Sequence, residues 1–241
     1  MQKLKLTKWT LFFILILSTI DMSAQNNVGK VHHLDIRQQN FVAISALTAI
    51  GNIEKLKTQL NIGLDGGLTV NEIKEALVQL YAYCGFPRSL NGITGFMQVL
   101  EERKNKGITD IEGKEATPLQ DSSDNYERGR KTLEILTKIP QSKPAPGFGE
   151  FAPRIDTFLK EHLFADIFDS DILDYQQREL VTISALAAMT GTDGQLQAHI
   201  GIGMNTGITA DQVRAVFEII EKMVSKDQAE TARAVFSKMN K

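Results

Sequence analysis

The residues best suited to chemistry in this sequence are two neighbours, Arg178 and Glu179, and a histidine twenty positions further on, His199. An imidazole can take up or release a proton near neutral pH, and a carboxylate beside it can orient the ring. A guanidinium can hold a substrate carboxylate through two parallel hydrogen bonds. Residues of these three types are thus able to move a proton and to hold an anion.

The segment that carries them occurs twice in the chain. Residues 42–50 and 181–189 are alike at most positions and lie 139 residues apart. The likeness continues in residues 61–69 and 201–209, at an offset of 140. A unit that is used twice allows each position to be compared between the copies.

The two copies differ at the ionisable positions. The first copy has neutral amides in place of the arginine, the glutamate and the histidine: Gln39, Asn40 and Gln59. The element Gly-Phe-Pro, residues 85–87, occurs only in the first copy. This division predicts one composite site per chain, with ionisable groups from the second copy and a wall from the first.

The candidate residues also have structural interpretations. A histidine on a helix is more often packed or capping than reactive, and Glu179 is favourable near the start of a helix for electrostatic reasons alone. Arg178 can serve as an ion-pair partner of Glu179 or Asp174. The remaining histidines show no metal-ligand spacing, so we expect neither a metal nor a cofactor. They are His32, His33 and His162.

Cys84 is the only cysteine. An intramolecular disulfide is therefore impossible, and a redox mechanism that needs a resolving cysteine in the same subunit is excluded. Peroxide reduction through Cys84 and an external thiol stays open as an alternative, and it would require an activated thiolate. The structural alternative is a small residue in the core.

Both copies show helical periodicity and clear helix boundaries. Residues 180–188 are almost continuously apolar and rich in small side chains, which is typical of a helix buried on most of its surface. A helix over residues 195–205 is expected to end at Gly207 in a left-handed cap. Capping boxes at Thr69 and Thr209 predict the start of the next helix in each copy.

No alternating pattern predicts a strand, so the expected fold class is all-α. We expect a first repeat over residues 35–110, a polar linker over 111–125 and a second repeat with lead-in helices over 126–240. The lead-in shows helical patterns over residues 126–139 and 151–168, separated by a break rich in proline and glycine.

The first 24 residues have the layout of a cleaved secretory signal, with three lysines, an apolar run and small residues that end at Ala24. We expect cleavage after Ala24 and export to a bacterial periplasm, with an uncleaved anchor as the alternative. Removing three lysines and Asp21 leaves 24 basic and 28 acidic residues, a formal net charge of −4. This balance offers no basic face for nucleic acid, so the expected partner is a small molecule.

Taken together, these motifs resemble the carboxymuconolactone decarboxylase family. The second copy carries the likeness in residues 178–189, in His199 and in residues 203–209. Residues 82–91 of the first copy are similar to the family's Gly-Phe-Pro element, and residues 126–174 are similar to its lead-in. The resemblance covers residues 35–236, nearly the whole chain after the signal.

The resemblance implies an all-helical AhpD-like fold that associates into a trimer-type ring of identical subunits. The alkylhydroperoxidase branch of these relatives uses a Cys-x-x-Cys pair with a glutamate and a histidine. The last two fall on Glu179 and His199, whereas the cysteine positions fall on Thr192 and Gln195. Neither of these side chains can be oxidised and reduced as a thiol can, so the mechanism of that branch is excluded.

The decarboxylase branch implies a cofactor-free lyase that acts on a small carboxylated lactone or related acid. Glu179 and His199 would then handle the proton, and Arg178 and Arg88 would bind the substrate carboxylate. The export signal argues against the namesake substrate, because its catabolism is normally cytoplasmic. Peroxiredoxin-type activity through Cys84 and a non-catalytic helical oligomer that binds a small apolar acid remain the alternatives.

Overall fold

The repeat in the sequence corresponds to two sets of helices in the same order. The computed structural model describes residues 34–119 and 124–239, and every regular element in these ranges is a helix. This confirms the predicted all-α class. The predicted export signal, residues 1–24, and the pair His32 and His33 lie outside the described residues.

The first repeat consists of α1 (Ile36–Ile50), α2 (Ile53–Asp65) and α3 (Val70–Asn105). Gly85 interrupts α3 with a φ of 82°, outside the helical region. Glycine tolerates this conformation because it has no Cβ, and Pro87 suits the start of the following half because the first turn of a helix needs no N–H there. The Gly-Phe-Pro element is therefore a break between two helical halves.

The second repeat consists of α7 (Tyr175–Ala188), α8 (Asp193–Asn205), α9 (Ala210–Met223) and α10 (Lys226–Met239). By sequence offset, α9 and α10 correspond to the two halves of α3. The capping boxes predicted at Thr69 and Thr209 are confirmed, and two further ones at Asp35 and Asp174 start α1 and α7. The predicted left-handed residue after α8 is also confirmed, since Gly207 has a φ of 105°.

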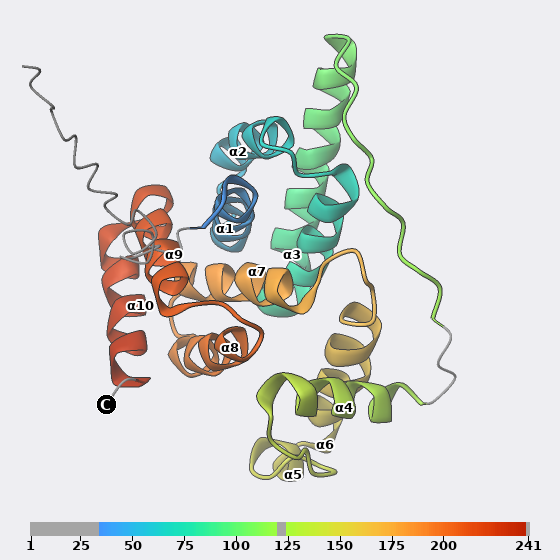
Figure 1. Ribbon diagram of the computed structural model, residues 1–241, viewed down its shortest axis with the longest axis vertical. Coiled ribbons are helices and arrows are strands. Elements are labelled where there is room, and N and C mark those ends of the chain that lie inside the picture. The colour runs from blue at the N-terminus through green and yellow to red at the C-terminus, as the bar shows by residue number, and fades with distance from the viewer. Residues whose placement is uncertain (1–33, 120–123, 240–241) are drawn as a thin grey trace, which may run out of the picture. The chain divides into compact units, whose positions relative to one another are not determined.

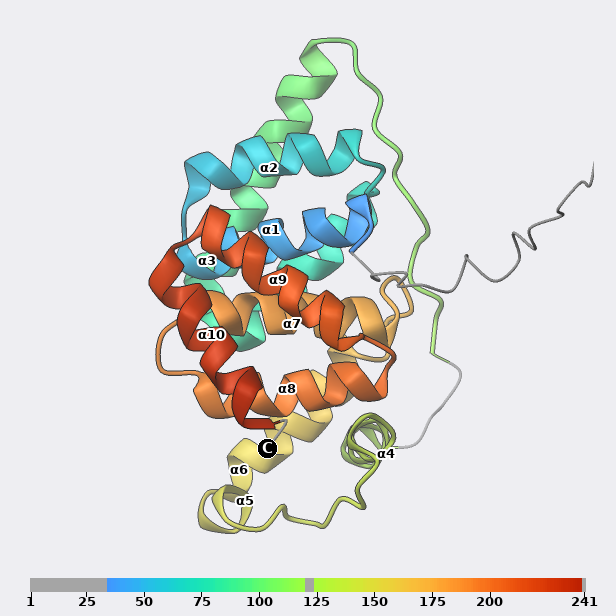
Figure 2. The same cartoon turned by 60° about the vertical axis from the view of Figure 1, so that its left-hand side comes forward.

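The repeats pack on each other through their first helices. α1 and α7 lie side by side in the middle of the helical assembly (Figure 1 and Figure 2). α9 packs against α1 and α3 packs against α7, so each repeat covers the first helix of the other. Beyond their first turn, α1 and α7 are buried on nearly all sides within one continuous apolar core.

A third group of helices stands between the repeats in the sequence. It comprises α4 (Asn125–Thr137), α5 (Phe148–Phe151), α6 (Pro153–Thr157) and the π-helix η1 (Phe158–Ile167). The helix predicted over residues 126–139 is confirmed as α4, whereas the single regular helix expected over 151–168 is wrong. That stretch begins as α6 and continues with the wider turns of η1. Close packing accompanies this change, because a Cβ on Gly129 of α4 would lie 1.7 Å from the carbonyl oxygen of Lys160.

The described residues of the linker expected over 111–125 are mainly exposed, and parts of it are held in place. The carbonyl groups of Ile111 and Glu112 accept hydrogen bonds of 3.0 and 2.9 Å from the first two N–H groups of α3. Further on, Asp171 accepts hydrogen bonds of 2.9 Å from both the N–H and the hydroxyl of Thr117. In the part of the chain that is described, no helix has the length and apolar character needed to cross a membrane.

Candidate functional site

Glu179 of α7 and His199 of α8 form a buried hydrogen bond. Glu179 Oε2 lies 2.8 Å from His199 Nδ1. The glutamate side chain is fully buried, and 11% of the histidine side chain is exposed. The structure therefore brings together the two residues that sequence analysis named as catalytic candidates.

The close approach of α7 and α8 makes this contact possible. A Cβ on Gly203 of α8 would lie 2.8 Å from Ile183 Cδ1 and 3.6 Å from Glu179 Cβ. A larger side chain at Gly203 would therefore require the Ile183 side chain to shift. The capping box at Asp174 fixes the start of α7, so that Glu179 lies in its second turn.

The hydrogen bond determines how His199 can act. In the neutral imidazole, Nδ1 donates to the carboxylate and Nε2 is left free to accept a proton; this tautomer is assigned from the hydrogen bond. The carboxylate also stabilises the imidazolium that forms when Nε2 takes up a proton. The other oxygen, Glu179 Oε1, is buried and has no hydrogen-bond partner among residues 34–119 and 124–239. Unsatisfied buried oxygens of this kind are rare and are often tolerated for function.

Tyr83 of α3 borders the pair from the first repeat. Its ring packs edge-on against His199, with 5.4 Å between the ring centroids. Its hydroxyl is buried near Glu179 and Thr182, yet no hydrogen bond of ordinary geometry reaches it from the described residues. Burial, followed by the negative charge of Glu179, raises the pKa of Tyr83, so the phenol stays neutral.

Sequence analysis did not single out Tyr83. Its counterpart in the second copy, at the offset of 140, is Met223. A polar aromatic residue in one copy and an apolar residue in the other was the available signal, and the proximity to His199 could not be read from it.

His199 also lines a pocket of about 440 Å³. α8 forms one side, and α4, α5, α6 and η1 form the other. The apolar lining includes Leu133, Phe148, Ile155, Leu159, Phe164 and Ile202. Its polar side chains are Thr137, Gln195 and His199. Sequence analysis expected residues 85–87 to form the wall; instead the wall comes from the helices between the repeats, of which α4 packs directly on α8.

The first copy has a neutral version of the same pair. Gln59 Nε2 donates to Asn40 Oδ1 at 2.7 Å, and both side chains are buried. The helix approach is also repeated, because a Cβ on Gly63 would lie 3.1 Å from Ile44 Cδ1 and 3.8 Å from Asn40 Cβ. The correspondence inferred from sequence offsets is thus a correspondence in space.

Comparison with known families agrees with this duplication. A model of the carboxymuconolactone decarboxylase family matches residues 22–94 and, a second time, residues 153–238. The chain belongs to the carboxymuconolactone decarboxylase family. The double match confirms a tandem member with one family unit in each repeat. A search of curated proteins finds no match to this chain.

In this carboxymuconolactone decarboxylase family member, Arg178 points to a different set of partners. Its guanidinium donates to Glu75 Oε1 at 2.7 Å, to Gln79 Oε1 at 2.9 Å and to the carbonyl of Ser170 at 2.6 Å. Glu75 and Gln79 belong to α3, so Arg178 connects the second repeat to the first. Arg178 is fully buried and does not line the pocket.

Arg88 and Cys84 are also absent from the pocket lining. Arg88 donates to the carbonyl of Ala49. The Cys84 thiol donates to the carbonyl of Leu80 at 3.1 Å, and burial raises its pKa, which opposes formation of a thiolate. Within the described ranges, no group of three or more His, Cys, Asp and Glu side chains could hold a metal ion.

Proposed function

We propose that this member of the carboxymuconolactone decarboxylase family is a cofactor-free enzyme with lyase-type proton chemistry. Its substrate would be a small lactone or related acid whose reacting carbon lies beside a carbonyl group. The observation that carries the proposal is the buried Glu179–His199 hydrogen bond at the edge of an apolar pocket. His199 exchanges the proton through Nε2, and Glu179 holds the ring.

With a carboxylated substrate, the lyase step balances with these two residues and a proton from solvent. A carbon–carbon bond breaks as CO₂ leaves, and its electron pair is delocalised into the neighbouring carbonyl group as an enolate. The N–H bond at Nε2 then breaks as a C–H bond forms, and solvent returns a proton to His199. Glu179 compensates the imidazolium charge before transfer. A positioned acid–base group of this kind contributes about 10²–10⁴-fold to a rate.

The test is hydrogen exchange in D₂O with α-angelica lactone, a probe with an acidic C–H beside its carbonyl group. We expect the protein to accelerate deuterium incorporation, followed by NMR. The double variant E179N/H199Q should reduce this acceleration by about 10²–10⁴-fold. It recreates the Asn40–Gln59 pair that the first copy already accommodates, so the fold should persist.

The matched control is Gln59→Asn in the first copy, which should leave the exchange rate unchanged. Far-UV circular dichroism verifies that both variants remain helical. Exchange no faster than in buffer, or a double variant as fast as the parent, would refute the proposed roles. In that case the pocket serves binding alone, as in the non-catalytic alternative.

A further inference from the structure

The pocket beside His199 contains no lysine or arginine in its lining. Its polar groups are a threonine hydroxyl, the Gln195 amide and the imidazole. A carboxylate that leaves water for such a lining loses its hydration without gaining a cation in exchange. The lining therefore favours uncharged molecules.

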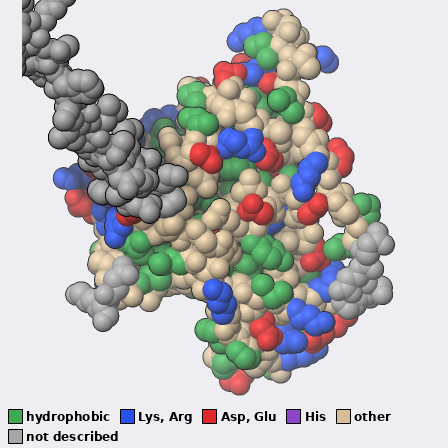
Figure 3. All heavy atoms as spheres, in the orientation of Figure 1, with side chains coloured by type: hydrophobic (Ala, Val, Ile, Leu, Met, Phe, Trp, Pro, Cys, Tyr) green, Lys and Arg blue, Asp and Glu red, His purple; other side chains and the backbone are tan. Residues whose placement is uncertain are grey.

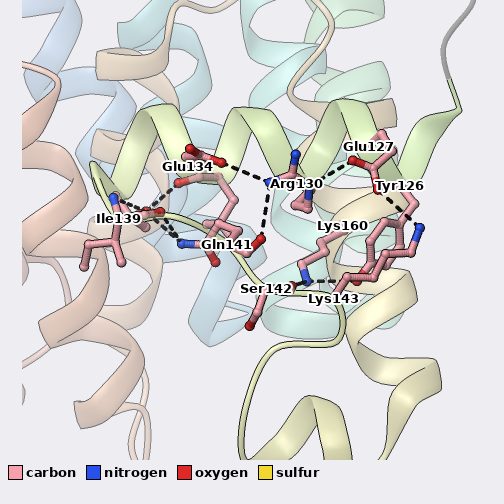
Figure 4. Close-up of polar contacts among 11 residues, drawn as sticks. Tyr126, Glu127, Arg130, Glu134, Ile139, Gln141, Ser142, Lys143 and Lys160 are labelled. Atoms are coloured by element: carbon pink, nitrogen blue, oxygen red, sulfur yellow. Dashed lines mark hydrogen bonds and ion pairs between the residues drawn. The ribbon is translucent and has the colours of Figure 1, made fainter.

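Two basic side chains of the adjoining helices, Arg130 and Lys160, already have partners. Arg130 of α4 bonds Glu127 at 2.9 Å, Glu134 at 3.0 Å and the carbonyl of Gln141 at 3.2 Å (Figure 4). Reaching a ligand would require Arg130 to abandon two carboxylates.

The ammonium group of Lys160, in η1, also has partners within the protein. It is completely buried, lies 2.9 Å from Asp156 Oδ1, and donates to the carbonyl of Ser142 at 2.7 Å and to the Tyr126 hydroxyl at 3.0 Å (Figure 4). Its three N–H donors therefore all have acceptors. Arg178, which sequence analysis proposed as a carboxylate ligand, is bound to α3 as described above.

Glu179 adds a negative charge behind the histidine. Its carboxylate lies 2.8 Å from the ring and is fully buried, where water screens it little. A second carboxylate against the same ring would be repelled by this charge. The charge of Glu179 and the uncharged lining thus both disfavour a carboxylate ligand.

Apolar surface continues beyond the pocket. A neighbouring pocket of about 280 Å³ shares Ile155 and Leu159 and adds Tyr81 and Phe158. Ile155 and Phe158 are each about half exposed, as is Phe148 of the first pocket. Apolar side chains also reach the surface at the lower end of the face shown in Figure 3. A mainly apolar ligand would find contacts from His199 outward.

We propose that the His199 pocket selects an uncharged, mainly apolar carbonyl compound and discriminates against carboxylates. This rests on the proposed proton exchange at His199 Nε2 and narrows the substrates to those without a carboxylate, which undergo no loss of CO₂. With a neutral substrate the reaction is a proton shift. A C–H bond beside the carbonyl breaks as an N–H bond forms at Nε2, which leaves an enolate, and the same proton returns to a different carbon.

Two ligands of nearly equal shape test this selection. They are 4-phenylbutan-2-one and 3-phenylpropanoate. The ketone has a methyl group on its carbonyl carbon where the carboxylate has a charged oxygen. We expect the ketone to bind the full folded chain at least tenfold more tightly in calorimetric titrations at pH 7.5, and to shift NMR signals of Ala198 and Ile202. Equal or tighter binding of the carboxylate, or no binding of the ketone, overturns the proposal.

Gln195→Arg adds a cation to the lining and should improve carboxylate binding at least tenfold relative to ketone binding, so that the preference for the ketone narrows or reverses. The control is Gln197→Arg on the same helix, which adds the charge at an exposed residue outside the pocket lining. An equal response to both variants would contradict the assigned location. Because binding needs no turnover, ligand selection and the exchange reaction can fail independently.

Discussion

The two repeats hold corresponding helices together in the same way and place different chemistry at the contact. In the first, Gln59 donates to Asn40 at 2.7 Å; in the second, Glu179 lies 2.8 Å from His199. The main packing partners of α2 are α1 and α3, whereas α8 also packs against α4 of the pocket. The helical scaffold thus does not depend on ionisable groups, and the surroundings decide whether such groups meet a ligand.

The hydrogen bonds that cross from one repeat to the other are also asymmetric. Arg178 reaches Glu75 and Gln79 of the other repeat, whereas the corresponding Gln39 bonds the nearby carbonyl of Leu34 at 2.8 Å. At the offset of 140, the counterparts of Glu75 and Gln79 are Ala215 and Ile219. The contact between α7 and α3 therefore includes polar side chains, whereas the corresponding positions of α9, which packs against α1, are apolar.

Replacing Arg178 should have the largest effect on stability. Arg178→Met removes one partner of a buried ion pair and should lower the free energy of unfolding by about 3–5 kcal/mol. Gln39→Met at the corresponding position should change it by less than about 1 kcal/mol, because one ordinary hydrogen bond is lost. Guanidinium denaturation curves measure both. Equal losses would mean that the two sides of the interface are energetically alike.

Transplanting the ionisable pair into the first copy is the next test. The variant N40E/Q59H should lose about 1–4 kcal/mol of unfolding free energy, because a neutral buried pair becomes a charged one. It should gain no exchange activity, since the helices of the pocket pack on α8. A stable variant with a second active site would show that the surroundings matter less than the pair.

The reverse substitution, which places the amide pair in the second copy, should change the free energy of unfolding by a smaller amount and in the opposite direction. E179N/H199Q replaces a buried carboxylate by a neutral amide. Within residues 34–119 and 124–239, the carboxylate has one unpaired oxygen, and the counterpart amide of Asn40 also has one unpaired atom, Nδ2. Because a neutral group costs less to bury than a charged one, we expect the unfolding free energy to stay equal or rise by about 1 kcal/mol. Thermal unfolding measures this change, and the loss of exchange activity accompanies it. A clear loss of stability would indicate that Glu179 and His199 serve the fold.

The smallest effect concerns pH and the segment that leads into the second repeat. Hydrogen bonds from Thr117 and then Lys114 lower the pKa of Asp171 to about 2. Because the unfolded value is about 3.9, the resulting stability is present above pH 4 and disappears as the pH falls through about 2. Asp171→Asn should therefore be less stable than the parent at pH 5 and equally stable at pH 2. A constant difference between these pH values would exclude this origin.

Much of the helical framework could be predicted from local patterns. Capping boxes at Thr69 and Thr209 and the left-handed Gly207 depend on neighbouring residues, and the structure has them where expected. The π-helical turns of η1 could not be predicted, because they accompany the close packing of Lys160 against Gly129, residues far apart in the sequence.

The candidate site divides in the same way. The family resemblance paired Glu179 with His199, and comparing the copies showed that each stands opposite a neutral amide, Asn40 or Gln59. The contact of Arg178 with α3, the approach of Tyr83 and the origin of the pocket wall all depend on how separate helices pack. No local pattern encodes such distances.

The sequence by itself determined an all-helical chain with two related units. It also placed the ionisable candidates Arg178, Glu179 and His199 in the second unit, opposite neutral amides in the first. It could do so because helix boundaries and periodicity are local, and because an internal repeat provides its own comparison. The tertiary structure decided that Arg178 serves the contact between repeats and that His199 meets an uncharged, apolar pocket. Long-range packing of α4 and η1 against α8 creates that pocket, and this packing sets the electrostatic environment in which the pair can act.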